Sequence, residues 1–235
     1  MIKADILKPA LYLIPTPIGN KDDITVRALK TLAGADILAC EDTRHTGQLL
    51  KTYKINSPKM VSCHEHNEKQ KAVYLCKEIE SGKAVAFVSD AGSPGISDPG
   101  FEIIREAISR DIPVINLPGA TAFVPALVGS GLANNRFTFA GFPPQKRGRI
   151  AFLEELSKYK STVILYESPH RIVKLLTELI ELCGIDRKVA VAREISKLYE
   201  EIIRGTLPEC LAVLEKKDRI KGEFVLVLAA DSESI

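Results

Sequence analysis

The sequence lacks the features that mark several classes of protein. Its net charge is only +2, from 32 Lys and Arg against 30 Asp and Glu in 235 residues, which argues against a uniformly basic nucleic-acid-binding protein. Its longest apolar runs are strand-sized and too short to cross a bilayer. No basic segment leads into a long apolar run at the N-terminus, so we expect no secretory signal, no membrane partner and a cytoplasmic location.

The five cysteines are an odd number, and no two are spaced as C-x-x-C. This pattern indicates neither a zinc ribbon nor a disulfide framework. We expect small buried side chains in a reducing compartment. His64 and His66 would point to opposite sides of an extended segment, so we expect no metal site there.

Apolar runs rich in β-branched residues alternate with amphipathic segments in the first half of the chain. Strands are predicted at 10–14, 35–40, 59–63, 83–89 and 113–117, with helices ending at Gly34, at Gly82 and at Ser109. Asp22 or Asp23 could cap the first of these helices. Such alternation predicts right-handed crossovers and a mostly parallel sheet, with ligands beyond the carboxyl ends of its strands.

The second half predicts a mixed sheet with flanking helices, in which the alternating segment 201–204 is an antiparallel edge. Its strands are predicted at 136–141, 161–166, 188–192, 201–204 and 224–229. We place a domain boundary at the Pro/Gly turn after Leu117, which gives two α/β domains, 1–117 and 118–235. Because no long linker separates them, we expect these domains to pack closely and enclose a cleft.

The segment 89–100 is the richest in glycine and proline. Gly92, Gly95 and Gly100 permit positive φ and close approach to a ligand, and two prolines stiffen the loop. It matches neither Gly-x-Gly-x-x-Gly nor a P-loop, so phosphate binding is not the first expectation. The alternative is an ordinary strand-to-helix turn capped by Asp98. Such a turn needs far fewer glycine and proline residues than this segment contains, which favours ligand binding.

The segment 136–149 contains four basic residues, three phenylalanines and no acidic residue. Aromatic rings beside cations suit unpaired bases and phosphates. A solvated loop next to a core strand is the alternative, and the segment alone favours that alternative.

Several longer motifs resemble one known family, in order along almost the whole chain. They are Ile14-Pro-Thr-Pro-Ile-Gly-Asn20, Ala39-Cys-Glu-Asp-Thr-Arg44, Ser62-Cys-His-Glu-His-Asn67, Val88-Ser-Asp-Ala-Gly-Ser-Pro-Gly-Ile-Ser-Asp-Pro-Gly100, Leu117-Pro-Gly-Ala-Thr-Ala122, Glu167-Ser-Pro-His-Arg171, Val191-Ala-Arg-Glu194 and Lys221-Gly-Glu-Phe-Val225. They resemble the tetrapyrrole methylases, and within that family the branch that methylates small-subunit ribosomal RNA.

The resemblance implies S-adenosylmethionine as methyl donor, bound between the two domains, and a homodimer. It implies methyl transfer to the 2′-hydroxyl of a cytidine in 16S ribosomal RNA of the small subunit. Carried over onto this sequence, the cofactor-binding residues are Pro17, Asp90, Gly92, Ser93, Gly95, Ile96, Thr121, Ala122, Tyr166, Arg193 and Glu223.

A ribose hydroxyl must lose its proton during such a transfer, so a general base is useful. The preferred candidates are Glu41, Asp42, His64 and Glu167, with His45, Glu65, His66 and His170 on similar loops. The alternative for each is a helix cap or an ion pair, such as Asp42 with Arg44 or Glu167 with Arg171. RNA phosphates call for cations, and the predicted set is Arg44, Lys146, Arg147, Arg149 and Arg171.

Two other functions stay open on the sequence alone. A methyltransferase acting on a tetrapyrrole would share the fold and the cofactor, but would need a spacious apolar cleft. A non-catalytic assembly factor that binds S-adenosylmethionine or RNA would use the same pocket without turnover.

Overall fold

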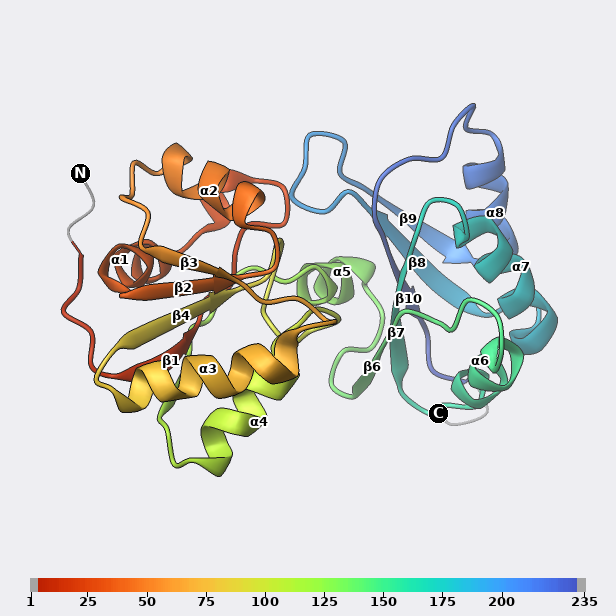
Figure 1. The fold of residues 1–235 in the computed structure, drawn as a ribbon. Coiled ribbons are helices and arrows are strands. Elements are labelled where there is room, and N and C mark those ends of the chain that lie inside the picture. Colours follow the sequence, from red (N-terminus) through yellow and green to blue (C-terminus); the bar gives the residue numbers. More distant parts are fainter. Residues whose placement is uncertain (1–3, 232–235) are drawn as a thin grey trace. The chain divides into compact units, whose positions relative to one another are not determined.

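The computed structural model describes residues 4–231 (Figure 1). The chain divides between Thr121 and Ala122 into two compact units. Each unit contains one five-stranded sheet with helices. None of the helices in the described part of the chain has both the length and the apolar character that crossing a bilayer requires.

The first unit contains a parallel sheet in the order β3-β2-β4-β1-β5. Its strands are β1 (Ala10–Leu13), β2 (Ile37–Cys40), β3 (Lys59–Ser62), β4 (Ala84–Val88) and β5 (Val114–Asn116). The strands β1, β2 and β4 are buried throughout, which is why they read as continuous apolar runs rather than alternating ones. The parallel sheet predicted from the first half is confirmed.

Helices cover both faces of this sheet (Figure 1). They are α1 (Val26–Gly34), α2 (Thr43–Thr52), α3 (Glu68–Glu80) and α4 (Phe101–Ser109). Leu11 and Leu13 of β1 pack with α3 and α4 on one face. The alternate residues Ala10 and Tyr12 pack with α1 and α2 on the other, as the period of two along a strand requires.

Helix starts differ from the expectation at two places. The cap of α1 is Thr25, whose hydroxyl accepts the N–H of Ala28 at 3.0 Å, because Asp22 and Asp23 lie in a separate 3-10 turn, Lys21–Asp23. Helix α4 begins after Gly100, so Gly100 and not Asp98 occupies its N-cap position.

The second unit contains a mixed sheet in the order β6-β7-β10-β8-β9. Its strands are β6 (Phe137–Gly141), β7 (Thr162–Glu167), β8 (Lys188–Arg193), β9 (Glu201–Thr206) and β10 (Phe224–Leu228). Only β6 and β7 pair in parallel, and β9 is an antiparallel edge strand. Both the mixed sheet and its antiparallel edge are therefore confirmed.

One face of this second sheet packs against α6 (Arg149–Ser157), α7 (Ile172–Cys183) and α8 (Leu207–Glu215). A capping box starts α8, in which Thr206 and Glu209 bond each other's backbone N–H. The helix α5 (Phe123–Ser130), absent from the sequence prediction, contacts β7, β8, β9 and β10. Helix α5 and the end of β7 carry the aromatic side chains described below.

Candidate functional site

Loops that follow β1 and β4 are joined at the carboxyl edge of the first sheet. The N–H of Thr16 donates to the carbonyl of Gly92 at 2.9 Å, and the N–H of Gly92 returns a bond to Thr16 at 3.0 Å. The buried Thr16 hydroxyl donates to the carbonyl of Ser89 at 3.2 Å. Pro17 directly follows this bridge, so the structure places it beside the segment that contains Asp90 and Gly92.

The loop from Asp90 to Gly100 folds back on itself. The N–H of Gly95 donates to the carbonyl of Pro99 at 3.0 Å. Gly100 has a φ of +144°, and a Cβ on it would lie 2.8 Å from the Gly95 nitrogen. Only glycine fits such a position without a shift of the backbone. The close approach fixes the conformation of Gly95 and Ile96, two of the predicted cofactor residues.

A buried carboxylate anchors the far end of this loop. Glu68, the first residue of α3, accepts the N–H groups of Gly100 at 2.9 Å, Glu102 at 2.9 Å and Ile103 at 3.3 Å. These are unpaired donors at the N-terminus of α4, where negative charge is favoured. Glu68 was not among the predicted site residues, because an acidic residue in a first turn normally indicates interaction with its own helix.

The segment after β5 also meets this loop. The Ser93 hydroxyl donates to the carbonyl of Ala120 at 3.1 Å, next to Thr121, which ends the first unit. The structure thus brings together the predicted cofactor residues of that unit, which are Pro17, Asp90, Gly92, Ser93, Gly95, Ile96 and Thr121. Ala122 begins the second unit and directly precedes α5.

Polar groups at this edge are left for a ligand. No backbone carbonyl within residues 4–231 accepts the backbone N–H of Ala91 or of Ser93. Asp90 uses one carboxylate oxygen to accept the N–H of Asp42 at 3.2 Å, and no described residue donates to its other oxygen. The edge therefore offers both hydrogen-bond donors and a carboxylate acceptor.

Glu41, which directly follows β2, has a carboxyl group whose pKa is raised, first by burial and then by the charge of Asp90. The nearby His64 and the backbone N–H of Asp90, which bonds this carboxylate, oppose the rise. A raised pKa makes a carboxylate more basic once it is ionised.

His64 has one ring nitrogen already occupied. The Asn67 carbonyl oxygen accepts the backbone N–H of His64 at 2.9 Å, so the amide nitrogen of Asn67 faces His64 Nε2 at 3.1 Å. An amide nitrogen only donates, which makes Nε2 the acceptor and leaves the proton of the neutral ring on Nδ1. His64 in this arrangement is a hydrogen-bond donor rather than a free base.

The expectation that His64 and His66 point to opposite sides of an extended segment is wrong. Residues 65–67 form a turn, and the two rings lie 6.0 Å apart between centroids. Within the described chain, no three His, Cys, Asp or Glu side chains gather as metal ligands would. Glu65 and His66, like His45 and His170 elsewhere, are exposed loop or helix residues.

Asp42 caps α2 and pairs with an arginine. Its carboxylate accepts the backbone N–H of Arg44 at 2.7 Å and lies 2.9 Å from the Arg44 guanidinium. These bonds to Arg44 lower the pKa of Asp42 to about 2. The predicted alternative, an ion pair of Asp42 with Arg44, is confirmed, and so low a pKa makes Asp42 a weak base.

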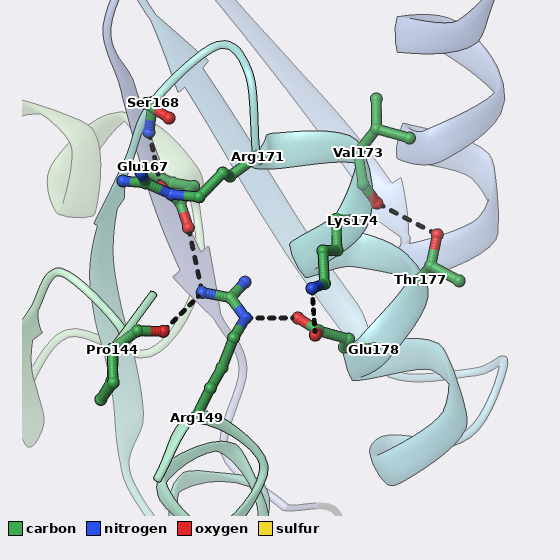
Figure 2. Close-up of polar contacts among 9 residues, drawn as sticks. All are labelled: Pro144, Arg149, Glu167, Ser168, Arg171, Val173, Lys174, Thr177 and Glu178. Atoms are coloured by element: carbon green, nitrogen blue, oxygen red, sulfur yellow. Dashed lines mark hydrogen bonds and ion pairs between the residues drawn. The ribbon is translucent and has the colours of Figure 1, made fainter. Parts of the chain in front are cut away.

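Glu167, at the end of β7, lies at the centre of a buried ionic network (Figure 2). One of its oxygens accepts the backbone N–H of Ser168 at 2.7 Å and Arg171 Nε at 2.8 Å. The other accepts Arg149 Nη1 at 3.4 Å. The ion pair expected between Glu167 and Arg171 is confirmed, and Glu167 is a bound counterion rather than an available base.

Arg149 corrects the prediction of an RNA contact. Its side chain is only 4% exposed and donates through Nε to Glu178 at 2.8 Å, while Nη1 also donates to the carbonyl of Pro144 at 3.2 Å (Figure 2). Lys174 lies 3.8 Å from Glu178 and extends the network to the surface. Arg149 is thus an internal residue, whereas Lys146 and Arg147 are exposed.

The predicted cofactor residues of the second unit share one end of its sheet. In the strand register, Tyr166 is opposite Val225, and Arg193 is opposite Phe224, the residue after Glu223. Arg193 Nε donates to the carbonyl of Lys221 at 2.6 Å. The antiparallel pairing of β10 with β7 and β8 therefore places Tyr166, Arg193 and Glu223 at one edge.

Comparison with known proteins gives two kinds of similarity. Residues 10–211 match the family model of Tetrapyrrole (Corrin/Porphyrin) Methylases. Proteins named ribosomal RNA small subunit methyltransferase I are 46% identical to this chain: the one from Synechocystis sp. over 93% of this chain and 78% of its own length, the one from Halalkalibacterium halodurans over 97% and 78%, and the one from Bacillus subtilis over 93% and 74%.

Solved structures share the fold at lower identity. A cobalt precorrin-4 methyltransferase is 20% identical with a TM-score of 0.66, over 94% of this chain and 95% of its own. Uroporphyrin-III C-methyltransferase from Thermus thermophilus, in complex with S-adenosylhomocysteine, is 17% identical with a TM-score of 0.65, over 96% and 100%. The motifs, the two sheets and the family match agree, and the chain belongs to the tetrapyrrole methylase family.

Proposed function

We propose that this protein transfers a methyl group to small-subunit 16S ribosomal RNA, with the 2′-hydroxyl of a cytidine as acceptor. One contrast carries the proposal: the relatives named for ribosomal RNA are 46% identical over 93–97% of the chain, whereas the tetrapyrrole enzymes compared are 17–20% identical and share the fold. The cytidine and its 2′-hydroxyl are supported by the motif resemblance.

The methyl donor is S-adenosylmethionine, which supplies an electrophilic methyl group when bound. The residues at the carboxyl edge of the first sheet fit it. Its carboxylate needs N–H donors, which Ala91 and Ser93 offer, and its ammonium and ribose hydroxyls need acceptors, which Asp90 offers. The bridge between Thr16 and Gly92 holds the start of this loop in place.

Glu41 is the general base in this proposal. Of the four predicted candidates, Glu167 is held by two arginines, Asp42 has a pKa of about 2 and His64 Nε2 already accepts a bond from Asn67. Burial and Asp90 raise the pKa of Glu41 instead. The Glu41 carboxylate would take the proton of the ribose hydroxyl as that oxygen bonds the methyl carbon, while the methyl–sulfur bond of the donor breaks and S-adenosylhomocysteine leaves. Alignment of the reacting atoms would supply most of the acceleration.

Exposed cations are proposed to contact the RNA backbone. Arg44, Lys146 and Arg147 are exposed, and Arg171 is 28% exposed. Because Glu167 holds Arg171 through Nε, both terminal nitrogens of that guanidinium keep a fixed orientation for a phosphate. The family resemblance further supports a homodimer, and a ribosomal substrate supports a cytoplasmic location.

The test incubates purified protein and labelled S-adenosylmethionine with unmodified small ribosomal subunits, with free 16S RNA and with a porphyrin precursor. We expect label on the 2′-oxygen of one cytidine in the RNA, which mass spectrometry of nuclease fragments would map. Label on the porphyrin alone would establish the tetrapyrrole alternative. Cofactor binding without transfer to any of the three would indicate an assembly factor.

A further inference from the structure

We propose that the 142–148 loop of the second unit binds an unpaired nucleotide of the RNA substrate. The base stacks on the ring of Phe142, and the adjoining phosphates contact Lys146 and Arg147. This inference rests on the proposed function, since it assumes an RNA substrate. It adds a residue, Phe142, and a mode of recognition that the basic residues do not provide.

Phe142 is exposed and yet held in place. The residue is 52% exposed, and its ring meets Tyr166 edge-on at 5.4 Å between centroids. Tyr166 in turn contacts Phe139 at 5.0 Å, which stacks on Phe123 at 4.7 Å. Single exposed apolar side chains are common, but a ring braced by an aromatic cluster loses little freedom on binding a second ring.

The other end of the loop is fixed from inside the unit. Arg149 donates its backbone N–H to the carbonyl of Lys146 at 3.3 Å and its Nη1 to the carbonyl of Pro144 at 3.2 Å. The buried carboxylates of Glu167 and Glu178 hold this arginine (Figure 2). The loop is therefore pinned at two carbonyls, and the side chains of Lys146 and Arg147 extend into solvent.

Charge and ring together favour a single-stranded ligand. The segment 136–149 contains no acidic residue, so neither Lys146 nor Arg147 has a counterion within it. Phosphates satisfy such cations. A flat aromatic face suits a base that is not already stacked in a duplex.

Phe101 in the first unit provides a matched control. It is 62% exposed, and the Arg105 guanidinium lies 5.4 Å from the centre of its ring. Here, however, Glu102 lies 3.8 Å from Arg105 and also 3.8 Å from Lys69. Phe101 therefore also combines an exposed ring with a cation, but an acid in its own helix lies close to that cation, whereas the segment 136–149 contains no acid.

The test compares the variants Phe142→Leu, Phe142→Tyr and Phe101→Leu in methyl transfer to small subunits. We expect Phe142→Leu to raise KM for the subunits about tenfold, since loss of one stacked base weakens binding by about that factor or more. The kcat and the Kd for S-adenosylmethionine should stay unchanged. Phe142→Tyr retains a flat ring and should restore KM to within about twofold, and Phe101→Leu should leave it unchanged.

The phosphate contacts are tested separately by the double variant K146Q/R147Q. Its RNA affinity, measured against salt concentration, should show a slope smaller by about two counterions. An unchanged KM for Phe142→Leu, or a Phe142→Tyr variant as weak as Phe142→Leu, would overturn the stacking. An unchanged slope would overturn the phosphate contacts. If the wild-type protein labels no ribosomal RNA, the proposed function itself fails, which these comparisons would reveal first.

Discussion

Replacing Arg149 by methionine should strongly destabilise the second unit. Methionine keeps much of the volume of the side chain but leaves Glu178 and one oxygen of Glu167 without their internal cation. Both carboxylates are well buried, and removing one partner of a buried ion pair typically costs about 3–5 kcal/mol. Because Arg171 still pairs with Glu167, we expect the free energy of unfolding to fall by about 3 kcal/mol, the lower end of that range.

Urea unfolding followed by circular dichroism measures this change. The matched control is Arg110→Met, because Arg110 also contacts two carboxylates, Glu106 and Glu80, but is 26% exposed. Such partly solvated pairs are worth about 0–1 kcal/mol. A loss for Arg149→Met no larger than that for Arg110→Met would refute the reasoning.

Three further predictions concern activity. Glu41→Gln should lower kcat while leaving the Kd for S-adenosylmethionine unchanged. In the wild type, kcat should rise with pH through a pKa above that of an ordinary glutamate, because burial and Asp90 raise the pKa of Glu41. A wild-type pH profile that is flat through this range would exclude Glu41 as the base. Glu68→Leu should weaken cofactor binding in calorimetry, whereas Glu68→Gln, which keeps an oxygen acceptor for the N-terminus of α4, should retain most of it; equal losses would refute the anchoring role. Arg171→Lys keeps the positive charge but loses the paired N–H donors of the guanidinium, so RNA affinity should fall nearly as far as in Arg171→Gln. Full RNA affinity in the lysine variant would refute bidentate recognition of a phosphate.

The strands were predictable because they depend on local patterns. Runs such as 84–88 and 224–228 are buried throughout and lie between turn residues, so their length and β-branched content identify them. Helix α2 was missed because its sequence is mostly polar. What stabilises it is the burial of Leu50 against the first sheet and the cap from Asp42, and the first of these is a tertiary contact.

The site was predictable to the level of which loops gather, but not of what each side chain does there. Glu41 directly follows β2, Glu167 is the last residue of β7, and both stand next to polar residues in the sequence. Glu167 is neutralised by Arg149, which comes 18 residues earlier in the chain. Glu41 instead lies near Asp90. The sequence offered Arg171 as a local partner of Glu167, but it showed neither Arg149 beside Glu167 nor Asp90 near Glu41, so the choice of base needed the structure.

A nearly neutral chain can present a cationic loop when part of its charge is paired inside the protein. Arg147 and Arg149 are two residues apart, yet one is exposed and the other is buried against Glu167 and Glu178. A count of charges gives the two arginines and the two glutamates equal weight. The buried carboxylates of Glu167 and Glu178 are nevertheless compensated internally and contribute little field at the surface. Net charge therefore underestimates the positive potential at Arg147, and the salt dependence of RNA binding is the measurement that reports it.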